Sequence, residues 1–245
     1  MHIQFVGCGD AFGSSGRFNT CFHVVADETN FLIDCGATSL VAMKRLGLDR
    51  NAIDLILFTH FHHDHFGGLP FFLEDAQLIG KRSRPLTLVG PPSLRDRYTT
   101  MMEAAFPGSS QTPWRFQLAF RELEIGAGND FGAFRVTPFH VRHDDRAGPC
   151  LAHRIEVGGK VLTYSGDTEW TDALIEAARG ADLFISECYM RDKPWKGHLS
   201  LTALQEKLPT IGAKRVILTH MSDDMLENLG EVSFEIAEDG KIVAL

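Results

Sequence analysis

The stretch from Thr59 to Gly68 constrains this chain most, because residues 60–65 alone contain four histidines and one aspartate. The apolar run at 53–58 precedes it and is typical of a buried strand. A buried strand rarely ends in several imidazoles unless a metal ion satisfies their nitrogens. Neutral imidazole and carboxylate are ligands for zinc, manganese or iron. The stretch therefore predicts a metal site, and the strand context disfavours the alternative, a polar loop with incidental histidines.

Composition places the chain among globular proteins. Its 245 residues carry a formal net charge of −8 and suit one α/β domain over residues 1–245. Nucleic-acid-binding proteins usually expose a basic surface, so the acidic balance disfavours tight binding of long RNA or DNA. The five cysteines form no Cys-x-x-Cys pair, which favours a reducing, cytoplasmic location over a disulfide framework. The first residues suit a strand better than a signal peptide, and no run of about eighteen apolar residues suits a membrane span.

The apolar spacing predicts alternating strands and helices. Strands are expected at 2–6, 21–26, 30–33, 53–58, 85–89, 115–119, 131–138, 160–166 and 215–220, and helices at 38–46, 69–78, 94–105 and 171–179. A hairpin turn is expected at 27–29. The glycine-rich segment 7–17 lacks the Gly-Lys-Ser/Thr ending of a phosphate-binding loop, so it is interpreted as a loop near the site.

The second half of the sequence resembles the first. The segments 30–36 and 160–167 are both apolar strands that end near an aspartate and precede a predicted helix. The segments 53–60 and 215–220 are both apolar strands that end in Thr-His. This half-repeat predicts two sheet modules packed face to face, with helices outside and with polar strand ends meeting at a shared edge.

Residues that commonly bind metals follow several other predicted strands. His140 and His143 follow the strand at 131–138, and Asp167 follows the strand at 160–166. His220 ends the last strand, and His198 lies in the Gly-His-Leu-Ser segment at 197–200. One histidine at a strand end is usually structural, but histidines or aspartates at several strand or loop ends indicate one shared site.

These motifs resemble the metallo-β-lactamase superfamily over residues 3–220. The matching features, in chain order, are Leu-Ile-Asp-Cys-Gly at 32–36, Thr-His-x-His-x-Asp-His at 59–65, a single histidine, Gly-Asp-Thr at 166–168 and Thr-His at 219–220. The resemblance implies an α/β fold, the αββα four-layer sandwich of two mixed β-sheets flanked by helices, with two metal ions at one edge.

The resemblance also implies a set of ligands. His60, His62 and His143 would bind one ion, Asp64, His65 and His220 would bind the other, and Asp167 would bridge them. His140 is the alternative to His143, and His63 falls at a position that does not bind metal. Asp34 would orient a ligating histidine without binding metal, because a ligating imidazole needs a partner on its other nitrogen. The cofactors would be two divalent ions, zinc or manganese, with iron a further candidate.

Two such ions, about 3.5–4 Å apart, would lower the pKa of a water that bridges them, and the resulting hydroxide would attack the substrate. This chemistry serves phosphodiesters, thioesters, lactones and lactams alike. The segments 67–70, 85–91 and 197–200 resemble the ribonuclease Z and cyclic-phosphodiesterase branch. In that branch the counterpart of His198 faces the phosphate. His198 and Asp64 are therefore the expected catalytic residues, and Glu187 is expected to support them from outside the ligand set.

One departure from that branch concerns the substrate. Bacterial ribonuclease Z has a long tRNA-binding arm between the third histidine and the bridging aspartate, whereas only 24 positions separate His143 from Asp167 here. The expected substrate is therefore a small phosphodiester, such as a cyclic nucleotide or a cyclic ribose phosphate. The alternatives are a lactonase- or thioesterase-type acyl hydrolase, a ribonuclease Z-like RNA endonuclease, an iron oxygenase and, last, a binding module. The branch also implies a homodimer, and no membrane partner is expected.

Overall fold

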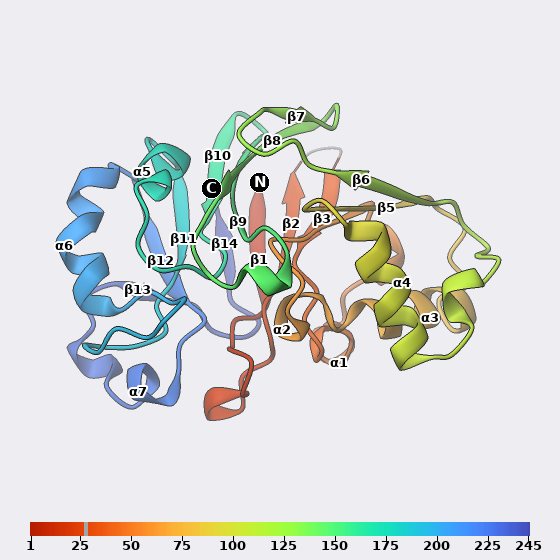
Figure 1. Ribbon diagram of the computed structural model, residues 1–245, viewed down its shortest axis with the longest axis horizontal. Helices are drawn as coiled ribbons and strands as arrows, with labels where there is room; N and C mark the ends of the chain where they lie inside the picture. The colour runs from red at the N-terminus through yellow and green to blue at the C-terminus, as the bar shows by residue number, and fades with distance from the viewer. Residues whose placement is uncertain (27–28) are drawn as a thin grey trace.

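Two β-sheets pack face to face in the computed structural model, which describes residues 1–26 and 29–245 (Figure 1). The first sheet has seven strands in the order β14 (Ile242–Ala244), β1 (His2–Gly7), β2 (Cys21–Ala26), β3 (Thr29–Ile33), β4 (Leu55–Leu57), β5 (Leu86–Gly90) and β6 (Leu118–Glu122). The second has seven in the order β13 (Glu235–Ile236), β12 (Val216–Thr219), β11 (Leu183–Glu187), β10 (Lys160–Tyr164), β9 (Leu151–Val157), β8 (Phe134–His140) and β7 (Asn129–Asp130). Both sheets contain parallel and antiparallel pairs.

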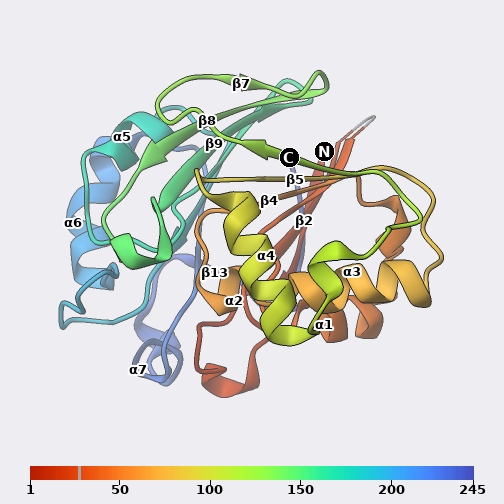
Figure 2. The same ribbon diagram turned by 45° about the vertical axis from the view of Figure 1, so that its right-hand side comes forward.

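Helices cover the outer face of each sheet. They are α1 (Ser39–Arg45), α2 (His63–Phe66), α3 (Leu69–Leu78), α4 (Leu94–Ala105), α5 (Ala173–Ala178), α6 (Leu201–Ile211) and α7 (Asp223–Leu226). Figure 2 shows α1, α3 and α4 beside the first sheet and α5 and α6 beside the second. The predicted αββα sandwich is confirmed. Within the described residues, no helix combines the length and apolar character needed to cross a membrane.

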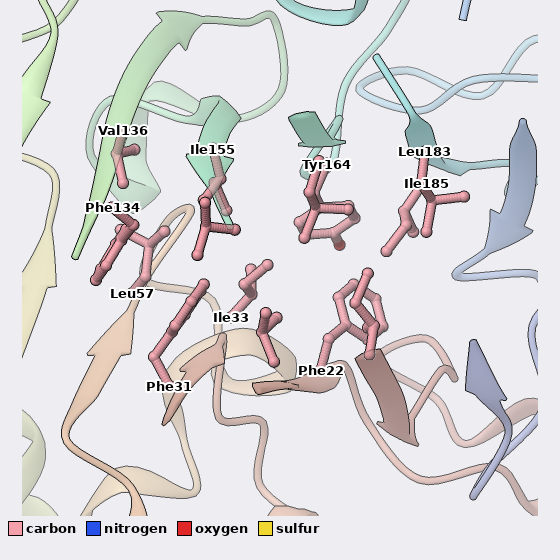
Figure 3. Packing of buried hydrophobic residues seen from close by; sticks show 14 of the residues in the cluster. Phe22, Phe31, Ile33, Leu57, Phe134, Val136, Ile155, Tyr164, Leu183 and Ile185 are labelled. Atoms are coloured by element: carbon pink, nitrogen blue, oxygen red, sulfur yellow. The ribbon is translucent and has the colours of Figure 1, made fainter. Parts of the chain in front are cut away.

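Alternation along the central strands explains why the sheets are buried on both faces. In β3, Phe31 and Ile33 point into the core between the sheets, whereas Leu32 points to the core beneath the helices. Figure 3 shows Phe31 facing Phe134 of the second sheet, and their rings stack with centroids 4.7 Å apart. Such a pair contributes roughly 0.5–1.5 kcal/mol beyond the area that it buries. This packing holds the two sheets in a fixed relation, which the site at their edge requires.

The helices that were predicted agree with the structure more closely than the predicted strands do. Helices α3 and α4 have the predicted bounds, and Gly47, with φ 68°, follows α1 as expected for a C-terminal glycine. The strand predicted at 115–119 begins instead at Leu118, because Phe116 packs into the core under the helices before pairing starts. The strand predicted at 131–138 begins at Phe134, since Gly132, with φ 79°, turns the chain between β7 and β8. The turn predicted at 27–29 falls partly outside the described residues.

The half-repeat is present, but its strands correspond differently from the sequence match. The unit β3–α1–β4 is a parallel pair joined by a helix, and β10–α5–β11 is the same unit in the second sheet. The topological counterpart of β4 is therefore β11, and β12 corresponds to β5. The sequence match between 53–60 and 215–220 therefore pairs β4 with β12, one strand away from its true counterpart. The two segments share the Thr-His ending but not the same place in the strand order.

Candidate metal centre

The strand ends of both sheets bring ligand-type side chains together. One group is His60, His62 and His143, another is Asp64, His65, Asp167 and His220, and a third joins His198 to His143 and Asp167. The first two groups together contain seven residues. In the first sheet they follow β4 and lie on α2; in the second they follow β8, β10 and β12. These seven residues, called here the metal cluster, are the ones that the resemblance implied. His140, the alternative to His143, is exposed at the end of β8 and belongs to none of these groups.

The three histidines of the first group direct nitrogens at one point. The Nδ1 of His62 lies 3.2 Å from the Nε2 of His60 and 3.0 Å from the Nε2 of His143. A tetrahedral zinc site with bonds of about 2.0–2.1 Å separates its donor atoms by roughly 3.3–3.4 Å. The three nitrogens are therefore spaced as ligands of one ion would be.

Asp167 connects the second group to the first. Its Oδ1 lies 3.2 Å from the Nε2 of His65, and its Oδ2 lies 3.2 Å from the Nε2 of His220. The same Oδ2 is 3.9 Å from the Nε2 of His60 and 3.8 Å from that of His143. Asp64 completes the second group, with its Oδ2 3.4 Å from the Nε2 of His65. The Asp167 carboxylate thus lies within 4 Å of ring nitrogens in both groups, a position that suits a ligand shared between them.

Two atoms of the metal cluster test whether a metal fits. The Nε2 of His65 and the Oδ1 of Asp167 are buried, and neither has a hydrogen-bond partner among the described residues. Buried polar atoms are almost always paired, because an unpaired one keeps its full desolvation cost. The two atoms lie 3.2 Å from each other within the second group, without the geometry of a hydrogen bond. Oxygen and nitrogen donors with this spacing fit a divalent cation such as zinc or manganese.

Burial sets the protonation of the first group. It lowers the pKa of His60, and neighbouring histidines add to that effect. The pKa values of His62 and His143 are also lowered, chiefly by burial. Neutral imidazole is the form that binds a metal. The pKa of Asp167 is held well below its usual range, because His220 and His65 outweigh the opposing effect of burial. The carboxylate is therefore ionised, as a bridging ligand must be.

Each imidazole of the metal cluster has a partner for its other nitrogen. The contacts are His60 Nδ1 with Thr59 Oγ1 at 3.0 Å, His65 Nδ1 with Asp34 Oδ2 at 2.7 Å, His143 Nδ1 with Gly197 O at 2.7 Å, His220 Nδ1 with Thr20 Oγ1 at 3.3 Å and His62 Nε2 with Asp144 Oδ2 at 3.6 Å. The sequence prediction named only Asp34 among these partners. Thr59 could have been found from the Thr-His pair, whereas Asp144 depends on a loop conformation.

Asp34 occupies a strained backbone position beside the metal cluster. Its φ is 58°, which a non-glycine residue adopts only when its surroundings require it. Its carboxylate accepts hydrogen bonds from the backbone N–H and the hydroxyl of Thr59, at 2.8 and 2.9 Å. The next segment packs closely, because a Cβ on Gly36 would lie 2.1 Å from the carbonyl oxygen of Asp64. Only glycine permits this approach, which lets α2 pack closely against the end of β3.

His198 lies next to the metal cluster but is held by a different partner. Its ring centroid is 4.8 Å from that of His143 and 5.7 Å from that of His220. Its Nδ1 lies 3.2 Å from both carboxylate oxygens of Glu187, a fully buried residue at the end of β11. Glu187 also accepts hydrogen bonds from the backbone N–H groups of Thr168 and Leu199. The pair leaves the Nε2 of His198 for another partner.

The electrostatics of His198 favour its charged form. Burial lowers the pKa of His198, but Glu187 outweighs burial and raises it to about 9. Tyr189 stacks on the ring with centroids 4.6 Å apart, which fixes its plane. Tyr189 was absent from the sequence prediction, because no motif marks it. His63, expected to stay outside the ligand set, is exposed and lies in neither group.

Comparison with known families identifies the chain. Residues 1–242 match the family described as Anti-Pycsar protein Apyc1. The chain belongs to this family.

Relatives of this Apyc1-family chain align with it over most of its length. Ribonuclease Z of Agathobacter rectalis is 25% identical, with 92% of this chain and 89% of the relative covered. YhfI of Bacillus subtilis, named "Probable metallo-hydrolase YhfI", is 24% identical, with 90% and 87% covered. The crystal structure of YhfI, a metallo-β-lactamase fold protein, matches with a TM-score of 0.77 at 20% identity and covers 99% of both chains. Human tRNase Z, short form, matches with a TM-score of 0.80 at 24% identity and covers 100% of this chain and 99% of its own.

These matches confirm the superfamily and its ribonuclease Z-like branch, which the motifs predicted. The Apyc1-family chain is thus a metallo-β-lactamase fold protein, and its named relatives in this branch are metal-dependent hydrolases or ribonucleases.

Proposed function

We propose that this protein is a metal-dependent hydrolase that cleaves a small phosphodiester, such as a cyclic nucleotide or a cyclic ribose phosphate. The proposal uses the metal cluster and the Glu187–His198 pair beside it. Ribonuclease Z, the name of one relative, supports a phosphodiester as the bond that is cleaved.

The metal cluster would hold two divalent ions. His60, His62 and His143 suit one, Asp64, His65 and His220 suit the other, and Asp167 suits a bridge. Such ions supply an activated water and positive charge that offsets the charge developing on the phosphate oxygens. Asp64 has its pKa held below its usual range by His65 and His220, against the effect of burial, so it is an ionised donor.

The observation that carries the proposal is the position of His198. Its ring adjoins both groups of the metal cluster, and Glu187 holds its Nδ1. A protonated imidazole in this place can donate a proton to the oxygen that leaves phosphorus, which is general acid catalysis. A cation bound nearby would lower the pKa of His198 from its raised value. The proposed role of His198 as proton donor therefore rests on the position of its ring and not on its pKa.

Comparison of aligned lengths supports a small substrate. The match to ribonuclease Z of Agathobacter rectalis extends over 280 aligned positions, although it includes only 92% of this 245-residue chain. That relative therefore has segments that this chain lacks. The match to YhfI extends over 229 positions with 90% of this chain covered, so YhfI is of similar length. Between His143 and Asp167 this chain has only the short turn η4 (Asp145–Ala147) and the β9–β10 hairpin.

The test is a substrate panel on the metal-loaded protein. We expect hydrolysis of bis-p-nitrophenyl phosphate and of cyclic nucleotides with zinc or manganese, and little cleavage of a lactone, a thioester or a precursor tRNA. In His198→Ala, kcat for the phosphodiesters should fall by about 10²–10⁴-fold with bound metal unchanged, because the general acid is lost. Exposed His140→Ala is the matched control and should leave kcat unchanged.

Two results would overturn the proposal. One is cleavage of a lactone or thioester by protein that cleaves no phosphodiester. The other is full phosphodiesterase activity in His198→Ala, which would show that the position of this ring does not matter. Efficient cleavage of a precursor tRNA with no activity on small phosphodiesters would instead support the ribonuclease alternative.

A further inference from the structure

A cavity of about 480 Å³ opens beside His198, outside the metal cluster. This volume lies within the range of small-molecule sites, about 300–1,000 Å³. Two indole rings, a proline and a leucine form most of its apolar lining: Trp170, Pro194, Trp195 and Leu199. We call these four residues the tryptophan pocket. It lies at the start of α6, which Figure 1 shows at one end of the molecule.

The tryptophan pocket is connected to His198 through a short turn and a stack of rings. The backbone N–H of His198 donates to the carbonyl of Trp195 at 3.0 Å, which closes the turn. The Trp195 ring meets Tyr189 edge to face with centroids 6.0 Å apart. Tyr189 in turn stacks on His198 at 4.6 Å. A ring placed against Trp195 would therefore lie beside the group that we propose protonates the leaving oxygen.

The indole ring of Trp170 is held in place, whereas that of Trp195 is available to a ligand. The Nε1 of Trp170 donates to the Oδ1 of Asp172 at 3.3 Å, and the ring packs against the core beside α6. The Trp195 side chain is 54% exposed, although exposing an indole to water costs free energy. Polar groups at the margin, Glu169 and Lys196, can orient a ligand, but the Glu169 carboxylate disfavours a second phosphate. The lining suits a flat, uncharged aromatic ring.

We propose that the tryptophan pocket binds an aromatic ring carried by the substrate on its leaving-group side, a nucleobase or an aryl group, and that Trp195 is its main contact. The proposal rests on the proposed function. Stacking on an aromatic side chain tolerates any base, because every base has a π-face. The substrate is then a phosphodiester with an aromatic substituent, and a cyclic ribose phosphate without a base is disfavoured.

The experiment compares two hydrolysis-resistant phosphate monoesters on the zinc-loaded full chain. Adenosine 5′-monophosphate has a base, and ribose 5-phosphate is the same compound without one. We expect the first to quench tryptophan fluorescence and to inhibit bis-p-nitrophenyl phosphate hydrolysis with a Ki about tenfold lower than the second, a difference of ~1.4 kcal/mol. Fluorescence reports binding without turnover, so the pocket can be tested even if the protein does not cleave phosphodiesters.

Variants assign the effect to Trp195. In Trp195→Ala, the Ki and fluorescence dissociation constant for adenosine 5′-monophosphate should rise about tenfold, while the Ki for ribose 5-phosphate stays unchanged. Trp195→Leu keeps apolar bulk without a flat ring and should give the same result. It replaces the alanine variant if that variant folds poorly. Trp114→Phe is the matched control, because Trp114 contacts Tyr98 on α4 at the other end of the molecule (Figure 1). Equal Ki values for the two monoesters, or equal weakening of both in Trp195→Ala, would overturn the proposal.

Discussion

The carboxylate of Asp144 lies 3.6 Å from the Nε2 of His62, on the side of the ring that faces away from the metal cluster. It is held there by Arg146, whose guanidinium donates to both of its oxygens and whose backbone N–H donates to its Oδ1. A carboxylate behind a ligating imidazole fixes the ring and raises its basicity. Asp144 is thus placed to strengthen the hold of His62 on a metal.

Asp144→Asn should weaken metal binding at the three-histidine group by about 10–100-fold, because asparagine keeps the contact to the Arg146 N–H but lacks the negative charge. Competition with a chromogenic chelator measures the dissociation constant of each ion directly. The neighbouring substitution Asp145→Asn, at an exposed residue, is the control. Unchanged affinity in Asp144→Asn, or an equal loss in Asp145→Asn, would show that the contact has no role.

The residues that gather in the metal cluster could be named from the sequence because their types and order are diagnostic, but the partners of their other nitrogens could not. Asp34 and Thr59 stand in recognisable motifs beside the ligands. Asp144 and Gly197 reach His62 and His143 only because the η4 turn and the 195–198 turn fold towards the metal cluster. Such contacts depend on loop conformation, which short spacing rules do not specify.

At the scale of elements, the central strand β11 and helix α6 were absent from the sequence prediction, as were the short strands β13 and β14. Helix α6 was missed although Ser200 accepts a hydrogen bond from the backbone N–H of Ala203 and Gly212 ends the helix with φ 70°. Those signals were in the sequence. Strands β13 and β14, with two and three residues, carry too little pattern for any periodicity to show. Their pairing comes from the neighbouring strands.

Glu235, in β13, contacts residues next to β12 and β14 and so links three strands. Its carboxylate accepts two hydrogen bonds from Arg215, just before β12, and contacts Lys241, just before β14 in the other sheet. The hydrogen bonds from Arg215 are the main cause that lowers the pKa of Glu235 to about 2. A carboxylate whose pKa is lowered on folding stabilises the folded state above its unfolded pKa, and this stabilisation is lost as pH falls through the folded value.

Glu235→Gln should therefore lower the free energy of unfolding at pH 7, and the difference from the parent should shrink between pH about 4.5 and 2. The effect should stay below ~1 kcal/mol, because the side chains are partly exposed and solvent screens the pairs. Urea unfolding at several pH values measures it. Glu156→Gln, at an exposed residue of β9, serves as the control. A difference that grows as the pH falls would contradict the assignment.

Across the whole molecule, the metal cluster joins the two sheets at one edge. His60, His62, Asp64 and His65 come from the first sheet and α2, and His143, Asp167 and His220 come from the second sheet. The core between the sheets ends at this edge, so charged ligands replace apolar contacts there. The chain has a net charge of −8, yet the pair of divalent ions that we propose would outweigh the two carboxylates of the metal cluster. An acidic protein can therefore bind an anionic substrate here.

Metal removal should destabilise the protein as a whole, because it leaves buried donors unpaired and frees the two sheets at this edge. An ion present at about 1,000 times its dissociation constant contributes roughly 4 kcal/mol. For a protein of this size, that corresponds to a fall in Tm of about 8–16 °C on adding a chelator. Differential scanning calorimetry, with re-addition of zinc, measures the shift. In Asp167→Ala, which lacks the bridging ligand, the chelator should lower Tm by only a few degrees. An equal Tm for the parent with and without chelator would mean that no metal ties the sheets together.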